Sequence, residues 1–140
     1  MLQGDIFNTI SRGARLGKLY LRSASSGVGK SRTMVGDCCT LAYPIRYNQT
    51  KQIWESTGSC ERVVYIATEQ DINEIQTMIL AYLTGINEEV FLYGTFSLQD
   101  MNLIMKAIKL MEKFKDNLWL IRISDPSASV VKNTIRRYNL

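Results

Sequence analysis

Residues 23–33 read SASSGVGKSRT, and this stretch decides the fold that the sequence predicts. Gly27 and Gly29 give a turn conformational freedom and let another group approach the backbone closely. Lys30 would place an ammonium between the β- and γ-phosphates of a triphosphate, and Ser31 would offer a hydroxyl to Mg²⁺. The stretch therefore predicts a phosphate-binding loop of the general pattern G-x-x-x-x-G-K-[ST].

The flanking sequence supplies the context that such a loop requires. Residues 17–23 alternate apolar and polar side chains as a strand does, and residues 30–43 carry apolar side chains at helical spacing until Pro44 ends the helix. Ala24 replaces the first glycine of the pattern, which alanine can do if its dihedral angles stay in an allowed region. The residues expected to contact the phosphates are Ala24, Ser25, Ser26, Gly27, Val28, Gly29, Lys30, Ser31 and Arg32.

The rest of the chain alternates strands and helices. Strands are expected at 62–69 and 118–124, and helices at 71–85, at 97–117 and from 125 onwards. Capping boxes are expected at Asp71 with Glu74 and at Ser97 with Asp100. Residues 44–61 are expected to hold a short helix or a hairpin, and 90–96 a short strand or turn. This order predicts an α/β fold with a mostly parallel sheet and helices on both faces.

Composition narrows the class of protein. The 140 residues are 46% hydrophobic and 21% charged, which predicts one soluble globular domain without a membrane span, in the cytoplasm. Histidine is absent and the three cysteines form no C-x-x-C pair, so zinc binding and Ser–His or Cys–His catalysis are not expected. The cysteines are expected to be small, buried apolar residues in a reducing compartment.

Charge is distributed unevenly along the chain. The net charge is +4, yet residues 63–105 carry six acids and no base. This acidic stretch could pair with basic flanks of a neighbouring subunit. Four bases near the first predicted strand either contact DNA or a subunit or are simply solvated: Arg12, Arg15, Lys18 and Arg22. Trp54 and Trp119 are expected to be core residues or partner anchors rather than base-stacking platforms.

Two acids follow predicted strands. Glu69 lies after the strand at 62–69, at the sheet edge where ligands bind in open α/β folds, so it either orients a hydrolytic water or is a solvated acid near a helix N-terminus. Asp125 follows the strand at 118–124 and is either a metal ligand or a helix cap.

These residues together resemble a known family. GARLGKLYLRSASSGVGKSRT, with alanine opening the loop, resembles the motor domain of DnaB-type replicative helicases among the RecA-like ATPases. VVYIATEQD resembles the family segment that ends in a catalytic glutamate, onto which Glu69 falls. LWLIRISDPSASVVKNTIRR resembles the next strand and helix of that family. The long 44–61 connection suggests a phage- or plasmid-associated branch.

The resemblance implies a function as well as a fold. Residues 1–140 would be a single, partial RecA-like ATPase domain that binds ATP and Mg²⁺, with Lys30 and Glu69 as catalytic residues and Ser31 at the metal. The family's metal-binding aspartate, DNA-contacting loops and arginine finger would lie beyond Leu140, so Asp125 would not be the metal ligand. The full-length protein would be a homohexamer that unwinds DNA by pulling a single strand, and this chain alone would hydrolyse ATP poorly or not at all.

Two other functions fit the same residues. One is a RecA-like recombinase or a circadian-type ATPase, which shares the loop and the acid after the strand. The other is a module complete in itself that binds nucleotide for assembly and does not hydrolyse it.

Overall fold

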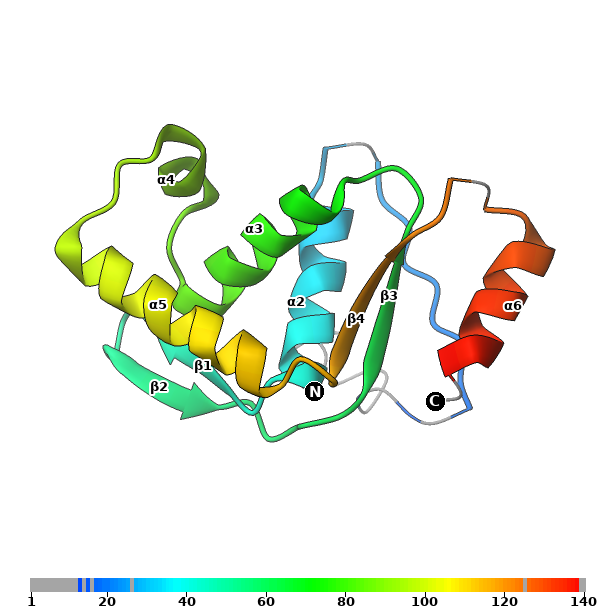
Figure 1. Ribbon diagram of the computed structural model, residues 1–140, viewed down its shortest axis with the longest axis horizontal. Coiled ribbons are helices and arrows are strands. Elements are labelled where there is room, and N and C mark those ends of the chain that lie inside the picture. The colour runs from blue at the N-terminus through cyan, green and yellow to red at the C-terminus, as the bar shows by residue number, and fades with distance from the viewer. Residues whose placement is uncertain (1–12, 14, 16, 26, 125, 139–140) are drawn as a thin grey trace.

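The computed structural model describes residues 13, 15, 17–25, 27–124 and 126–138 of the chain. Figure 1 shows short strands set among helices, with α6 at one end and α4, the start of α5 and the β1–β2 hairpin toward the other. In chain order the elements are α2 (Lys30–Ala42), β1 (Ile45–Asn48), β2 (Ile53–Ser56), β3 (Val63–Ala67), α3 (Ile72–Thr84), α4 (Glu88–Tyr93), α5 (Leu98–Lys113), β4 (Leu118–Arg122) and α6 (Ala128–Tyr138).

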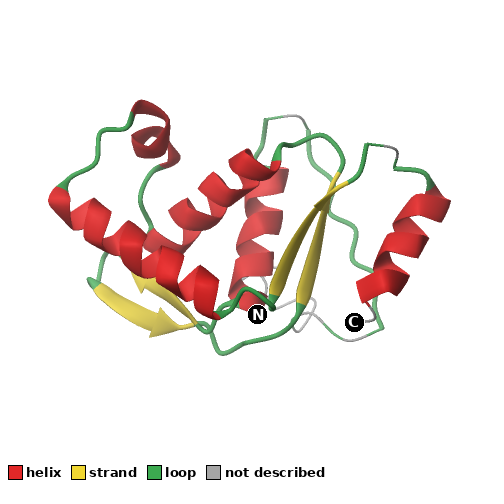
Figure 2. Cartoon of the chain, in the orientation of Figure 1, coloured by secondary structure: helices red, strands yellow, loops and turns green. Residues whose placement is uncertain are grey.

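The strands form two separate pairs. β3 and β4 run parallel, from Val63 opposite Leu118 to Ala67 opposite Arg122. β1 and β2 form an antiparallel hairpin within the 44–61 connection, which was one of the two predicted outcomes for that segment. Figure 2 shows the hairpin and the parallel pair as distinct sheets.

The predicted RecA-like fold with a mostly parallel sheet is wrong. In the described part of the chain only β3 and β4 pair in parallel, and the second sheet is antiparallel. The 44–61 connection folds back on itself and pairs its own backbone groups, because a hairpin needs no distant partner. Helices and strands do alternate along the chain, but the strands build no continuous sheet within the described residues.

The first predicted strand, 17–23, is also not formed. The segment passes β3 on the side of α6 (Figure 1), and it lies in neither strand pair. Leu19 is 97% exposed and Leu21 is 93% exposed. Alternation shows which side chains would share a face, but a strand also needs a neighbour to pair with its backbone N–H and C=O groups.

The core lies where α2 meets α3. Ile75, Ile79 and Leu83 recur every four residues along α3, and each is at most 1% exposed. They join Val35 and Cys39 of α2 in one buried cluster, which α5 and the parallel pair also enter. Burying a large aliphatic side chain contributes about 1.5–3 kcal/mol, so this seam between α2 and α3 fixes the direction of α2.

Two helix starts show where local signals succeed and fail. At α5, Ser97 and Asp100 form the predicted capping box, and these hydrogen bonds lower the pKa of Asp100. At α3, Asp71 occupies the predicted N-cap position, but its carboxylate forms an ion pair with Arg122 and makes no cap hydrogen bond. The predicted capping box with Glu74 is therefore wrong, because parallel pairing brings the end of β4 beside the start of α3.

A short helix replaces the strand or turn predicted at 90–96. The side chain of Asn87 accepts a hydrogen bond of 3.1 Å from the Glu89 backbone N–H and so starts α4. Gly94 ends the helix in a left-handed conformation, with φ of 66°. The capping asparagine and the glycine were visible in the sequence, but the apolar run between them also fits a strand.

Gly85→Ala should destabilise the protein more than Gly94→Ala. Both glycines have left-handed φ angles, 70° and 66°, where a side chain costs about 1–2 kcal/mol. Only at Gly85 would a Cβ also lie 2.6 Å from the Gln49 side chain, which donates a hydrogen bond to the Thr84 carbonyl. Urea denaturation measures both free energies of unfolding, and equal losses would contradict the role of the Gln49 contact.

Candidate functional site

The loop before α2 depends on two left-handed glycines. Gly27 has φ of 80°, and Gly29 has φ of 88° with ψ of 26°. A Cβ at either position would meet nothing within 4 Å, so backbone conformation rather than crowding favours glycine here. The conformational role predicted for both residues is confirmed, and their contact with phosphate stays a prediction.

Lys30 lies across the loop that precedes it. Its ammonium nitrogen, Nζ, donates to the carbonyl oxygens of Ala24 at 2.6 Å and Ser25 at 3.2 Å. Because these are backbone oxygens on an exposed loop, an anion can compete with them for the ammonium. Lys30 is therefore positioned over the loop that the sequence identified.

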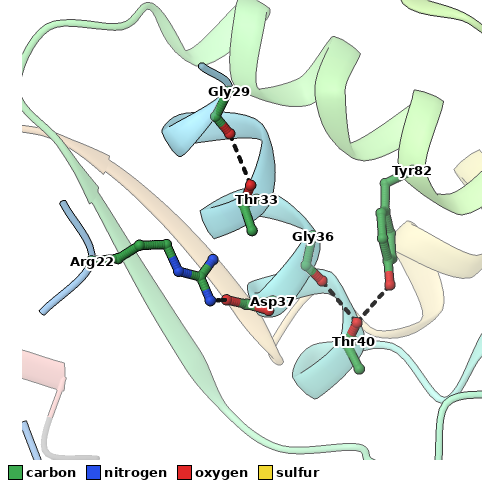
Figure 3. A network of polar contacts seen from close by, with 7 residues as sticks. All are labelled: Arg22, Gly29, Thr33, Gly36, Asp37, Thr40 and Tyr82. Atoms are coloured by element: carbon green, nitrogen blue, oxygen red, sulfur yellow. Dashed lines mark hydrogen bonds and ion pairs between the residues drawn. The ribbon is translucent and has the colours of Figure 1, made fainter. Parts of the chain in front are cut away.

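The N-terminus of α2 opens toward the same loop. Gly29 is the N-cap residue and offers no side chain to the first turn, which contains no acidic residue. The Gly29 carbonyl is held by Thr33, whose backbone N–H and Oγ1 donate to it at 3.0 Å and 2.9 Å (Figure 3). A helix start of this kind leaves backbone N–H groups and a partial positive charge available to an anion.

Two polar contacts hold α2 on opposite sides. Arg22, in the segment that leads into the loop, forms a 2.9 Å ion pair with Asp37 in the middle of α2 (Figure 3). On the other side, the Thr40 hydroxyl contacts the Gly36 carbonyl at 2.8 Å and the Tyr82 hydroxyl of α3 at 2.6 Å. The first contact anchors the loop's lead-in to the helix, and the second anchors the helix to the core.

Asp37 is a residue that sequence reasoning missed. Its side chain is 9% exposed, and a buried carboxylate requires a charged or hydrogen-bonding partner. The available signal was an acid within a helix whose neighbours, Cys38 and Cys39, are apolar. Its partner could not be found in the same way, because Arg22 was one of several bases near the loop.

A cavity of about 600 Å³ adjoins the loop. It lies between α2, β3 and α6, and Lys30, Ser31 and Arg22 contribute its polar groups. The remaining lining is formed by Met34, Cys38, Val64, Tyr65, Ile66 and Ile135. The site thus combines a cationic, hydroxyl-bearing side at the start of α2 with a mostly apolar wall.

Arg32 is directed to a different partner. Its guanidinium makes two hydrogen bonds of 2.8 Å to the carboxylate of Glu88 at the start of α4, which raises the pKa of Arg32. Both residues line a second cavity of about 620 Å³ between α2, α3 and α4. Contact of Arg32 with phosphate stays a prediction, and in this structure Arg32 joins α2 to α4.

Other predicted site residues are placed as follows. Glu69 is exposed and follows β3 by two residues. In Figure 1 the segment that leaves β3 and the segment that enters α2 lie at the same edge of the molecule. Val28 is 66% exposed on the loop. Ser26 and Asp125 lie outside the described residues. The roles predicted for Glu69 and Val28 stay predictions.

Side chains that could hold a metal ion do not gather in the described ranges. No group of three or more Cys, Asp or Glu residues there is arranged to bind one. Nor does any described helix have the length and apolar character needed to cross a bilayer.

The cysteines differ strongly in their surroundings. Burial raises the pKa of the Cys38 thiol to about 12 and that of Cys39 well above its ordinary value. Cys60 is exposed, and its Sγ accepts a hydrogen bond of 3.2 Å from the Asn117 side chain. Burial was predicted for all three cysteines, and for Cys60 that prediction is wrong.

The two tryptophans contact other parts of this chain, whereas contact of the basic lead-in with DNA or a subunit stays a prediction, and Arg12 lies outside the described residues. Trp54 packs against the core beside Tyr47, at 5.6 Å between ring centroids. Trp119 is half-buried in β4 and contacts Tyr138 of α6, with ring centroids 5.8 Å apart. Arg22 joins Asp37, as described above.

Comparison with known proteins shows similarity to a prophage-derived protein. No protein-family model and no solved structure matches the chain. The chain is 32% identical over 136 residues to the SPbeta prophage-derived uncharacterized protein YorI of Bacillus subtilis strain 168. The match covers 97% of this chain but only 27% of that protein, so the chain spans about a quarter of the length of its curated relative.

Asp37→Ala should destabilise the fold by about 3 kcal/mol. Removing one member of a buried ion pair typically costs 3–5 kcal/mol, and Arg22 retains 24% exposure, which favours the lower end. Lys51→Ala is the matched control, because it removes the exposed ion pair with Glu55 and should change stability little. Urea denaturation compares the two variants, and equal stability losses would show that the Arg22–Asp37 pair is unimportant.

Only one of the three thiols should react with a thiol reagent in the folded protein at pH 8. Cys60 is exposed and Cys39 is buried, whereas Cys38 is partly buried in the cavity wall and burial raises its pKa to about 12, which leaves little of the reactive thiolate at pH 8. Absorbance of released thionitrobenzoate should show one fast equivalent in buffer and three in denaturant. The Cys60→Ser variant should lose the fast phase, and a fast phase that remains would contradict the assignment.

Proposed function

We propose that this chain binds the phosphates of a nucleoside triphosphate, ATP foremost, at residues 24–31. The observation that carries the proposal is the position of Lys30, whose ammonium spans a loop set by two left-handed glycines at the start of a helix. A charged donor, conformationally free glycines and backbone N–H groups are what a triphosphate site requires.

The chain's own residues have separate tasks in this proposal. Lys30 exchanges the Ala24 and Ser25 carbonyls for phosphate oxygens, which bind an ammonium more strongly because they are charged. The Ser31 hydroxyl is one ligand for Mg²⁺, which proteins usually bind through few side chains together with phosphate oxygens. The apolar wall of the adjoining cavity is available to the less polar part of the nucleotide.

The wider proposal is that the chain is the ATP-binding part of a cytoplasmic DNA helicase of the DnaB type. It is supported by the loop with alanine at position 24 and by Glu69 after β3, which would orient the hydrolytic water. Strand displacement, a single-stranded DNA partner and a hexameric ring belong to this wider proposal.

Lys30→Ala should weaken ATP binding at least tenfold while leaving the fold intact. A hydrogen bond from a charged donor contributes about 1.5–3 kcal/mol, and 1.4 kcal/mol corresponds to tenfold in affinity. Isothermal titration with Mg·ATP measures the effect, and inorganic triphosphate should compete. Lys18→Ala is the matched control, since it removes an exposed cation from the lead-in and should bind ATP as the unaltered chain does.

The outcomes distinguish the proposed ATP site from the wider proposal of a helicase. Unchanged affinity in Lys30→Ala would overturn the site, as would an unaltered chain that binds no ATP. Glu69→Gln should bind normally, because its proposed role is in hydrolysis. The full product of the gene should displace a strand from forked DNA with ATP, and should lose that activity in Lys30→Ala; strand exchange without displacement would favour a recombinase.

A further inference from the structure

Two cavities flank the start of α2. Lys30 and Ser31 line the cavity beside the phosphate loop, whereas Arg32 and Thr33 line the cavity of about 620 Å³ between α2, α3 and α4. Lys30 and Arg32 are two residues apart in the first turn, and a helix turns by about 100° per residue, so their side chains leave opposite sides of α2. An anion at the end of the helix axis therefore lies between these two cations.

The Arg32 side chain can reach the space in front of the helix. The Cα–Cβ bonds of a helix tilt toward its N-terminus, so a long side chain in the first turn can extend beyond the backbone. A guanidinium presents paired N–H donors that match phosphate oxygens. In the structure these donors face Glu88 instead, because Nε and Nη2 of Arg32 each donate to a carboxylate oxygen of Glu88 at 2.8 Å.

The ion pair between Arg32 and Glu88 is of a kind that a stronger anion can displace. The Arg32 side chain is 66% exposed and that of Glu88 is 22% exposed. Exposed ion pairs typically change an equilibrium constant by about fivefold or less, because both partners remain hydrated. A triphosphate carries more negative charge than one carboxylate, so it offers Arg32 the stronger partner.

Glu88 takes its position from its own helix. It is the first residue of α4, which Asn87 caps by accepting a hydrogen bond from the Glu89 backbone. Just before the cap, Ile86 is buried in a small apolar cluster with Tyr47. Since neither contact involves Arg32, α4 keeps its start when the ion pair is broken.

We propose that Glu88 competes with a bound triphosphate for Arg32 and so lowers the affinity of the phosphate site. Without the ligand, Arg32 is held by Glu88; with it, the guanidinium transfers to phosphate oxygens and leaves Glu88 to water. Glu88 does not itself contact the phosphates and acts through Arg32, so it is a positioning residue. This inference rests on the proposed triphosphate site and adds to it a residue that sets its affinity.

Isothermal titration of Glu88→Gln with Mg·ATP tests the competition. The variant should bind about two- to fivefold more tightly than the unaltered chain, because a neutral amide holds the guanidinium less strongly. Glu89→Gln is the matched control, since it removes the same charge from the same turn and the same cavity but is not the partner of Arg32. It should change the affinity far less. No tightening in Glu88→Gln, or equal tightening in both variants, would overturn the proposal.

A second pair of variants separates competition from a structural role of Glu88. Arg32→Ala should weaken binding, and adding Glu88→Gln to it should give no further change, because the competitor acts only through Arg32. A purely structural role would lower the affinity whether or not Arg32 is present. Tightening that persists in the Arg32→Ala background would contradict the proposal.

Inorganic triphosphate identifies the part of the ligand that Arg32 receives. It should gain as much affinity from Glu88→Gln as ATP does, and a gain for ATP alone would overturn the transfer to phosphate. If the unaltered chain binds neither ligand, the proposed site is overturned and this inference with it. If binding depends on Lys30 but is insensitive to Glu88→Gln, the site stands and only the competition is overturned.

Discussion

The buried seam between α2 and α3 is the contact on which the other features of this chain depend. Ile75, Ile79 and Leu83 from α3 meet Val35 and Cys39 from α2, and all five are nearly inaccessible to solvent. Because α2 cannot rotate without exposing this seam, its N-terminus has one fixed direction. The loop at 24–29 takes its position from that constraint.

The candidate site follows from holding the two ends of one loop. Its far end is continuous with α2, and its near end is tied to the same helix by the ion pair between Arg22 and Asp37. Between these ends, Gly27 and Gly29 supply left-handed conformations, and Lys30 folds back over the carbonyls. A loop held at both ends loses less conformational entropy when it closes on an anion.

Two ion pairs show how a charged partner from another element determines what a residue can do. Arg32 directly follows Ser31 in the first turn of α2, yet Glu88 of α4 holds its guanidinium with two hydrogen bonds. Asp71 begins α3, yet Arg122 at the end of β4 takes its carboxylate. In both cases a residue with an obvious local role has a partner from another element.

The sequence by itself determined the features that arise within a few residues of one another. These are the loop with its glycines, the end of α2 before Pro44, the capping box of α5 and the helical spacing of α3. Their physical causes are local, namely backbone dihedral preferences, capping hydrogen bonds and the period of apolar side chains. Phosphate binding by Lys30 and orientation of a hydrolytic water by Glu69 are inferred from the sequence pattern and remain proposals.

Only the tertiary structure decided which segments pair. Residues 17–23 have the alternation of a strand but lie in neither strand pair, the 44–61 connection forms a separate hairpin, and Asp37 receives its charge partner from before the loop. Each outcome depends on groups distant along the chain, so no local pattern contains it. Strand pairing and ion pairing need a partner in space, and the partner's position is set by the packing of the α2–α3 seam.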